Sequence, residues 1–140
     1  MNLRGYIFSR PFMNERVPQR VQNLVIRDYC SRNNYNYLLS FTEYAFNEDF
    51  YILQNLVNNM KEIDGIIFYS IFLLPKQDNI RMNLINKILK QKKYLFFALE
   101  DMKLFNKNDI HKIDNIWKIK KNLNKIKESE LIQSLKLNDN

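Results

Sequence analysis

The sequence predicts a three-layer α/β domain, in which a four-stranded, mainly parallel sheet lies between helices on both faces and is followed by a helical tail. Three observations lead to this prediction. Short apolar runs alternate along the chain with segments of helical periodicity, as in β-α-β units. The runs at 65–69 and 94–99 are apolar on both alternations, which indicates central strands covered on both faces. The length of 140 residues suits one domain, and no hinge-like linker interrupts it.

The strands and helices are expected to alternate at regular intervals. The predicted strands are 3–8, 37–41, 65–69 and 94–99, and the predicted helices are about 17–32, 50–61 and 80–91. Residues 1–105 are therefore expected to form the α/β domain. Residues 106–140 are expected to form a Lys- and Asn-rich helical tail that packs on this domain or extends from it.

Local signals support the first two predicted helices. Pro18 suits the first turn of the first helix. An apolar face at helical spacing is expected to pack on the sheet, and it consists of Val17, Val21, Leu24 and Val25. The start of the second helix is expected to be capped by the polar run Asn47, Glu48 and Asp49.

The composition is that of a folded protein with a basic surface. Hydrophobic residues make up 46% of the chain and charged residues 26%, and the net charge is +7. The whole positive excess lies in residues 71–140 and is almost entirely lysine, so we interpret it as a solvated surface rather than a recognition surface. No apolar run is long enough for a signal peptide or a membrane span, so we expect a soluble, cytoplasmic protein.

Arginine has a different distribution from lysine. Six of the seven arginines fall between Arg4 and Arg32, in a chain that otherwise uses lysine. Arg10, Arg16 and Arg20 follow the first strand and are expected to converge near the start of the first helix, where they suit a phosphate, sulfate or carboxylate. The alternative is that Arg16 and Arg20 pair with Glu15 and with solvent on an exposed helix face.

Polar side chains also stand at the carboxyl ends of the predicted strands, where open parallel sheets bind ligands. Glu43 and Glu100 end two strands and could share acid and base roles, or could neutralise the arginines. The candidate catalytic residues are Glu43, Glu100 and Ser9. The candidate ligand-binding residues are Arg10, Arg16, Gln19, Arg20, Tyr44, Tyr69 and Ser70.

Several chemistries have no support in the sequence. The chain has no G-x-G-x-x-G segment, no Walker loop and no metal-spaced His/Cys cluster, so neither a cofactor nor a metal is expected. The only histidine, His111, lies in the tail, which argues against a Ser-His arrangement with Ser9 or Ser70. Cys30 is the only cysteine and is expected to pack as a small apolar side chain.

Four strings of this chain resemble the sporadic carbohydrate cluster family, whose genes occur patchily in bacterial surface-polysaccharide clusters. They are GYIFSRPFMNERVPQRVQNLVIRDYC at 5–30, TEYA at 42–45, IDGIIFYSIFLLP at 63–75 and FALE at 97–100. The resemblance implies a role in surface carbohydrate biosynthesis but no particular reaction.

The order of elements across residues 4–102 also resembles the catalytic domain of resolvase-type serine recombinases. That resemblance implies a parallel sheet in the strand order 2-1-3-4. The family's catalytic residues do not match, because Phe8 and Arg10 stand where the family has an arginine and its nucleophilic serine, and Ser9 is one place out of register. The family's Asp-Arg-Leu-x-Arg segment is replaced by Phe72, Leu73, Leu74 and Pro75, and we expect no helix-turn-helix extension of the family's kind.

Three functions remain open at this point. The first is a protein of bacterial polysaccharide biosynthesis that binds or modifies a phosphorylated or nucleotide-linked sugar. The second is a non-catalytic subunit that docks on a partner protein or a second copy through apolar tail residues such as Ile113 and Trp117. The third, nucleic-acid binding, is not favoured, because the basic residues are interleaved with acidic ones.

Overall fold

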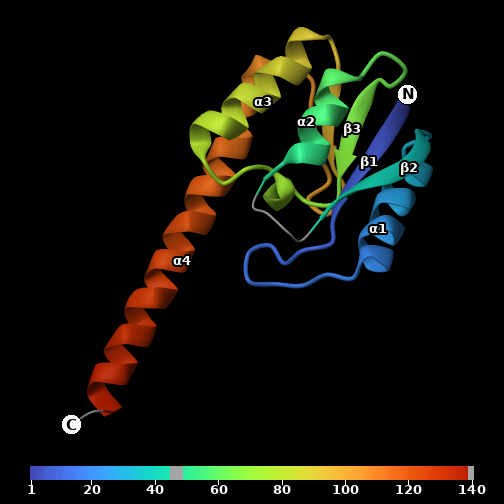
Figure 1. The fold of residues 1–140 in the computed structure, drawn as a ribbon. Helices are drawn as coiled ribbons and strands as arrows, with labels where there is room; N and C mark the ends of the chain where they lie inside the picture. Colours follow the sequence, from blue (N-terminus) through green and yellow to red (C-terminus); the bar gives the residue numbers. More distant parts are fainter. Residues whose placement is uncertain (45–48, 139–140) are drawn as a thin grey trace. The chain divides into compact units, whose positions relative to one another are not determined.

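The computed structural model describes residues 1–44 and 49–138, and it divides into two compact units (Figure 1). The first unit comprises Met1–Asp109 and holds the sheet. The second begins at Ile110. The predicted cap residues Asn47 and Glu48 lie outside the described residues.

The first unit is built on a five-stranded sheet in the order β2-β1-β3-β4-β5. The strands are β1 (Asn2–Phe8), β2 (Asn36–Glu43), β3 (Gly65–Phe68), β4 (Tyr94–Phe97) and β5 (Met102–Leu104). The first four are parallel and in the expected order, whereas β5 runs antiparallel to β4. The predicted number of four strands was therefore wrong. The strand it missed has only three residues and directly follows a turn in which Asp101 has a positive φ.

Helices cover the two faces of this sheet. Helix α1 (Gln19–Arg32) lies on one side, and α2 (Tyr51–Asn58) and α3 (Asp78–Lys90) lie on the other (Figure 1). These positions agree with the three predicted helices, although α2 is shorter than expected. Of two 3-10 turns, η1 (Ile71–Leu73) lies where a loop was predicted, and η2 (Lys107–Asp109) lies at the start of the predicted helical tail.

The predicted core face of α1 was wrong. The buried side chains of α1 are Gln22, Ile26, Tyr29 and Cys30. Val21 and Leu24 instead have 41% and 56% of their surface exposed. Periodicity alone favoured the valines, but a polar side chain that completes hydrogen bonds inside the protein determines the rotation of this helix, as shown below. Cys30 is packed as expected, and burial raises the pKa of its thiol to about 11.

Aromatic side chains fill the core on both faces of the sheet. On the α2 side, the ring of Phe68 lies 5.3 Å from that of Tyr6 and stacks on Phe97 at the same distance. On the α1 side, Tyr29 contacts Phe96. Gly65 allows β3 and β4 to start close together, because a Cβ atom there would lie 2.5 Å from the carbonyl oxygen of Tyr94.

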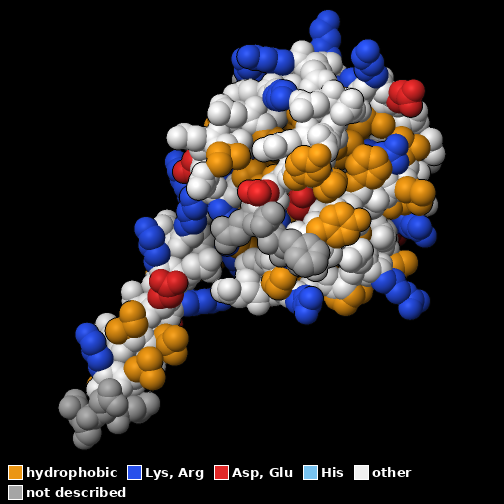
Figure 2. All heavy atoms as spheres, viewed as in Figure 1, with side chains coloured by type: hydrophobic (Ala, Val, Ile, Leu, Met, Phe, Trp, Pro, Cys, Tyr) orange, Lys and Arg blue, Asp and Glu red, His pale blue; other side chains and the backbone are white. Residues whose placement is uncertain are grey.

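The second unit is a single helix, α4 (Ile110–Asn138), where one or two helices were expected. Apolar side chains are exposed along it (Figure 2), and they are Ile119, Leu123, Ile126, Leu131, Ile132, Leu135 and Leu137. Ile113 and Trp117, which were expected to form a docking face, are not among them. His111 is exposed. In the described part of the chain, no helix has the length and apolar character needed to cross a membrane.

Candidate functional site

The carboxyl ends of the four parallel strands meet at one edge of the sheet, as the register pairs Phe8 with Glu43 and Phe68 with Phe97. This edge is the predicted location of a ligand site. The side chains at the strand ends differ in what they contact. Those that are hydrogen-bonded within the protein have a structural role, and those that are exposed can contact a ligand.

A buried glutamine that the sequence analysis did not identify fixes α1 to the end of β1. The side chain of Gln22 accepts a hydrogen bond from the Phe8 amide at 3.0 Å and donates to the Phe8 carbonyl at 2.8 Å. Its amide nitrogen also donates to the Val17 carbonyl at 2.8 Å. Gln22 thus pairs with the main chain of β1 as a neighbouring strand would. Gln22 lies four residues before Ile26 and seven before Tyr29, and this spacing places it on the same helix face. The spacing could have identified it as an inward residue, but a polar residue is not counted in an apolar pattern.

Glu43, at the end of β2, caps helix α2 from inside the protein. It is 3% exposed, and its carboxylate accepts hydrogen bonds from the amides of Ile52 and Leu53 at 3.0 and 3.1 Å. The Tyr6 hydroxyl donates to the same carboxylate at 2.7 Å. Burial, together with Glu43, raises the pKa of Tyr6 well above its ordinary value, so Tyr6 remains the proton donor of this pair.

Glu100, at the end of β4, holds the start of η1 in a similar way. One carboxyl oxygen, Oε1, accepts hydrogen bonds from the Ser70 hydroxyl at 3.0 Å and from the Ile71 amide. The other, Oε2, is buried and has no hydrogen-bond partner among the described residues. Burial raises the pKa of Glu100 above its ordinary value, because removal from water disfavours the charged form.

Ser70 and Tyr69 are largely enclosed at the end of β3. The Ser70 hydroxyl, besides donating to Glu100, accepts from the Phe72 amide at 3.2 Å and so caps η1. Burial raises the pKa of Tyr69, and the nearby carboxylates of Glu100 and Glu15 add to the shift. The Ser70 hydroxyl therefore has a structural role at the end of β3. Tyr69 is 6% exposed, so little of its side chain is accessible at this edge.

The residues directly after β1 are also engaged within the protein. The Ser9 hydroxyl donates to the Glu43 carbonyl at 3.0 Å, as does the Ser9 amide. The Arg10 guanidinium lies over the rings of Phe8 and Phe50, at 4.5 and 5.0 Å from their centroids, and donates to the Asp49 carbonyl at 3.0 Å. Arg10 is thus held at the start of α2, whereas the sequence analysis placed it at the start of α1.

An ordered turn leads from Arg10 to α1. Met13 and Asn14 both have positive φ, and the Phe12 and Glu15 main chains exchange two hydrogen bonds of 2.9 Å. This is a two-residue hairpin turn. The Phe12 ring anchors the turn, since it packs 5.9 Å from the Phe8 ring and 6.0 Å from the Tyr69 ring. Arg16 therefore follows a loop with a defined conformation.

The start of α1 is the part of this edge that carries uncommitted polar groups. Pro18 is the N-cap residue, no acidic residue lies in the first turn of the helix, and no side chain of the described residues caps it. The first amides bonded within α1 are those of Val21 and Gln22, so those of Gln19 and Arg20 remain for solvent or a ligand. Arg16, Gln19 and Arg20 are exposed, and neither arginine pairs with Glu15 within the described residues. Tyr44, at the end of β2, is 62% exposed.

Two solved structures have the same arrangement of elements. The N-terminal catalytic domain of TP901-1 integrase matches 90% of this chain and 97% of its own, with a TM-score of 0.61 and 14% identity. A resolvase family site-specific recombinase from Streptococcus pneumoniae matches 96% of this chain and 99% of its own, with a TM-score of 0.56 and 8% identity. The chain has a resolvase-like fold.

The similarity concerns the fold alone, because the identities are low. No family model and no curated protein matches the sequence. The expected relation to resolvase catalytic domains is thus confirmed at the level of the fold, while the carbohydrate cluster resemblance has no support from these comparisons. On this resolvase-like fold, the described residues contain no group of three or more His, Cys, Asp or Glu that could hold a metal ion.

We expect Gln22→Ala to lower the free energy of unfolding by about 2–4 kcal/mol, because it leaves both buried main-chain groups of Phe8 without a partner. Urea unfolding followed by circular dichroism measures this loss. Gln19→Ala is the matched control, since Gln19 is an exposed glutamine of the same helix, and it should change stability by less than about 0.5 kcal/mol. Similar losses in both variants would contradict the role of Gln22.

Glu100 should give the stability a recognisable pH dependence. Because its pKa is raised from 4.5, the folded protein binds this proton more tightly than the unfolded chain does. Stability is therefore lost as pH rises from about 4.5 to the raised pKa. In Glu100→Gln this loss is absent, so the unfolding free energy of the variant relative to the wild type should increase with pH across that window. Urea unfolding at several pH values tests this, with exposed Glu62→Gln as control. If the unfolding free energies of Glu100→Gln and the wild type changed with pH in parallel, the role of Glu100 would be excluded.

Proposed function

We propose that this protein binds a phosphorylated or nucleotide-linked sugar, with the phosphate at the start of α1, and acts in bacterial surface carbohydrate biosynthesis. The observation that carries the proposal is the uncapped start of α1, where exposed Arg16, Gln19 and Arg20 lie without an acidic partner among the described residues. The carbohydrate context comes from the sequence resemblance.

The chemistry of this end of α1 suits a phosphate. Free amides at a helix start carry a partial positive charge and point at a bound anion. Guanidinium groups add bidentate hydrogen bonds whose geometry matches phosphate oxygens. The hairpin turn anchored by Phe12 holds the preceding loop in place, which lowers the entropic cost of ordering Arg16 on binding.

The neighbouring strand end supplies a surface for the rest of the ligand. Tyr44 presents an exposed aromatic ring at the end of β2, on which a sugar or a base can pack. Glu43 and Glu100 are engaged in capping, and Ser9 donates to a main-chain carbonyl. We therefore propose binding and assign no bond-making step to these residues.

The proposal is tested by thermal shift and calorimetry with inorganic phosphate, sugar phosphates and nucleotide diphosphate sugars. We expect at least one sugar ligand to stabilise the protein, and Arg16→Ala or Arg20→Ala to weaken its binding about tenfold. Lys61→Ala removes a positive charge just before β3, at the opposite edge of the sheet, and should leave binding unchanged. The proposal fails if no ligand stabilises the protein or if the arginine variants bind as the wild type does.

Nucleic-acid binding is a second candidate, favoured by the neighbours, which are an integrase and a site-specific recombinase. The lysines of α4 would then contact phosphates. A short DNA duplex in the same experiment separates the candidates, because its binding must weaken steeply with salt. Binding to DNA that is lost between low and moderate salt, with no response to sugar ligands, would favour this candidate.

Docking on a partner, or on a second copy, is supported by the apolar side chains exposed on α4, including Leu131 and Leu135. If a second copy covers them, the full chain associates with increasing concentration. Leu131→Asp combined with Leu135→Asp should then give a monomer by light scattering, whereas Ser134→Asp, which adds charge beside them, should weaken association less. A wild-type chain that is monomeric at high concentration would exclude self-association through this face.

A further inference from the structure

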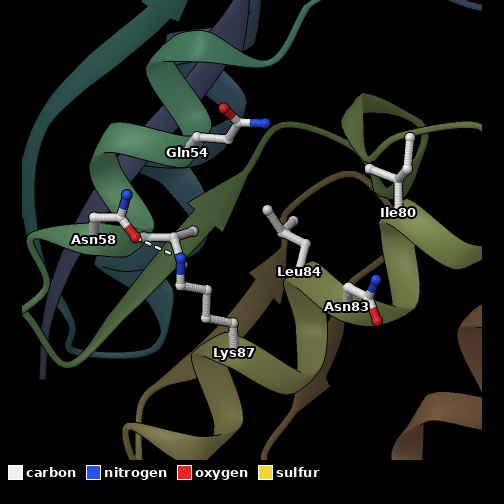
Figure 3. A pocket seen from close by; sticks show the side chains of 7 residues that line it. Gln54, Asn58, Ile80, Asn83, Leu84 and Lys87 are labelled. Atoms are coloured by element: carbon white, nitrogen blue, oxygen red, sulfur yellow. Dashed lines mark hydrogen bonds between the residues drawn. The ribbon is translucent and has the colours of Figure 1, made fainter.

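A groove lies between the outer sides of α2 and α3, with a volume of about 300 Å³ (Figure 3). Its lining residues are Gln54, Val57 and Asn58 from α2, and Ile80, Asn83, Leu84 and Lys87 from α3. These helices cover the face of the sheet opposite to α1. The groove is therefore separate from the arginine-bearing start of α1.

The floor of the groove is apolar. Val57 and Leu84 are 1% and 9% exposed, so only their outermost atoms reach the groove. Ile80 forms one lip and is 45% exposed. An aliphatic side chain lying against Ile80 and the edge of Leu84 would remove apolar surface from water on both partners.

The walls carry amide groups and a single charge. Gln54, Asn58 and Asn83 are exposed carboxamides on the two helices, and each offers both donors and an acceptor. The Lys87 ammonium donates to the Asn58 side-chain oxygen at 2.6 Å, which steadies it and uses one of its three donors (Figure 3). None of the seven lining residues is acidic, so the groove favours an anionic group beside Lys87.

We propose that this groove binds the free C-terminus of a partner polypeptide whose last residue is apolar. A terminal carboxylate matches Lys87, the last peptide groups match the carboxamides, and an aliphatic last side chain matches Ile80 and the edge of Leu84. Few other small groups combine these three features. A free phosphate would not contact the apolar side chains, and a simple apolar acid would have no peptide groups to hydrogen-bond with the carboxamides.

The test uses two fluorescein-labelled hexapeptides of one sequence that end in leucine, one with a free carboxylate and one with a C-terminal carboxamide. Fluorescence polarisation should show the free acid binding about tenfold more tightly than the amide. In Lys87→Met, which keeps the apolar stem, this difference should disappear. Lys90→Met removes a charge from the same helix outside the groove and should behave as the wild type.

Further probes test the floor and the carboxamides. A free-acid hexapeptide ending in serine should bind more weakly than the one ending in leucine, because it cannot cover the floor. Equal binding of acid and amide, retention of the difference in Lys87→Met, or no binding of any peptide would overturn the proposal. So would phenylacetate binding as tightly as the peptide, since it has no peptide groups for the carboxamides to recognise. Thermal unfolding of each variant verifies that it is folded.

Discussion

The hydrogen bonds between Gln22 and the main chain of Phe8 determine how the first third of the molecule is arranged. They occupy the amide and carbonyl groups of the last residue of β1, beyond the point at which the pairing of β1 with β3 ends at Tyr6 and Phe68. Because Gln22 must face inward, Ile26 and Tyr29 follow it into the core, while Val21 and Leu24 are turned to solvent. The same rotation determines the direction of Gln19 and Arg20 in the first turn of α1, so a buried amide that meets no ligand positions two of the groups proposed to meet one.

The acidic residues at the strand ends show why a polar edge is not necessarily a catalytic one. A parallel sheet brings strand ends next to the starts of the following helices, whose first amides need acceptors. Glu43 and Glu100 supply acceptors across the fold to α2 and η1, helical segments whose own N-caps are Phe50 and Ser70. Helix α3 has no side-chain cap either, but Asp78 places a carboxylate in its first turn. Within the described residues, α1 has neither a capping side chain nor an acidic residue in its first turn, so an external anion could take the acceptor's place there.

Features of this structure that depend on neighbouring residues in the sequence could be predicted, and features that depend on contacts between distant residues could not. Gly65–Phe68 and Tyr94–Phe97 were predictable because a strand buried on both faces is marked by its own apolar residues. The order of the strands needed a resemblance, since no local signal encodes which strands pair. The inward face of α1 was missed because periodicity treats glutamine as an outward residue, and β5 was missed because three residues carry no period. The polar strand ends were found, yet the partners of Glu43 and Glu100 lie at least nine positions away and follow only from the folded chain.

A shared fold with recombinase-like neighbours therefore constrains this protein less than its side chains do. The fold provides one edge at which the strand ends meet and a helical layer on each face of the sheet. The side chains at each of these places differ from one another and are not determined by the fold. The Ser9 hydroxyl donates to a main-chain carbonyl, and the Arg10 guanidinium lies over the rings of Phe8 and Phe50, so both side chains of the strand-end loop have contacts within the protein. The start of α1 and the α2–α3 groove lie on opposite faces of a rigid sheet whose core is filled with stacked aromatic rings. Because these two places lie on opposite faces, the proposed ligand and the proposed polypeptide partner would not compete for the same surface.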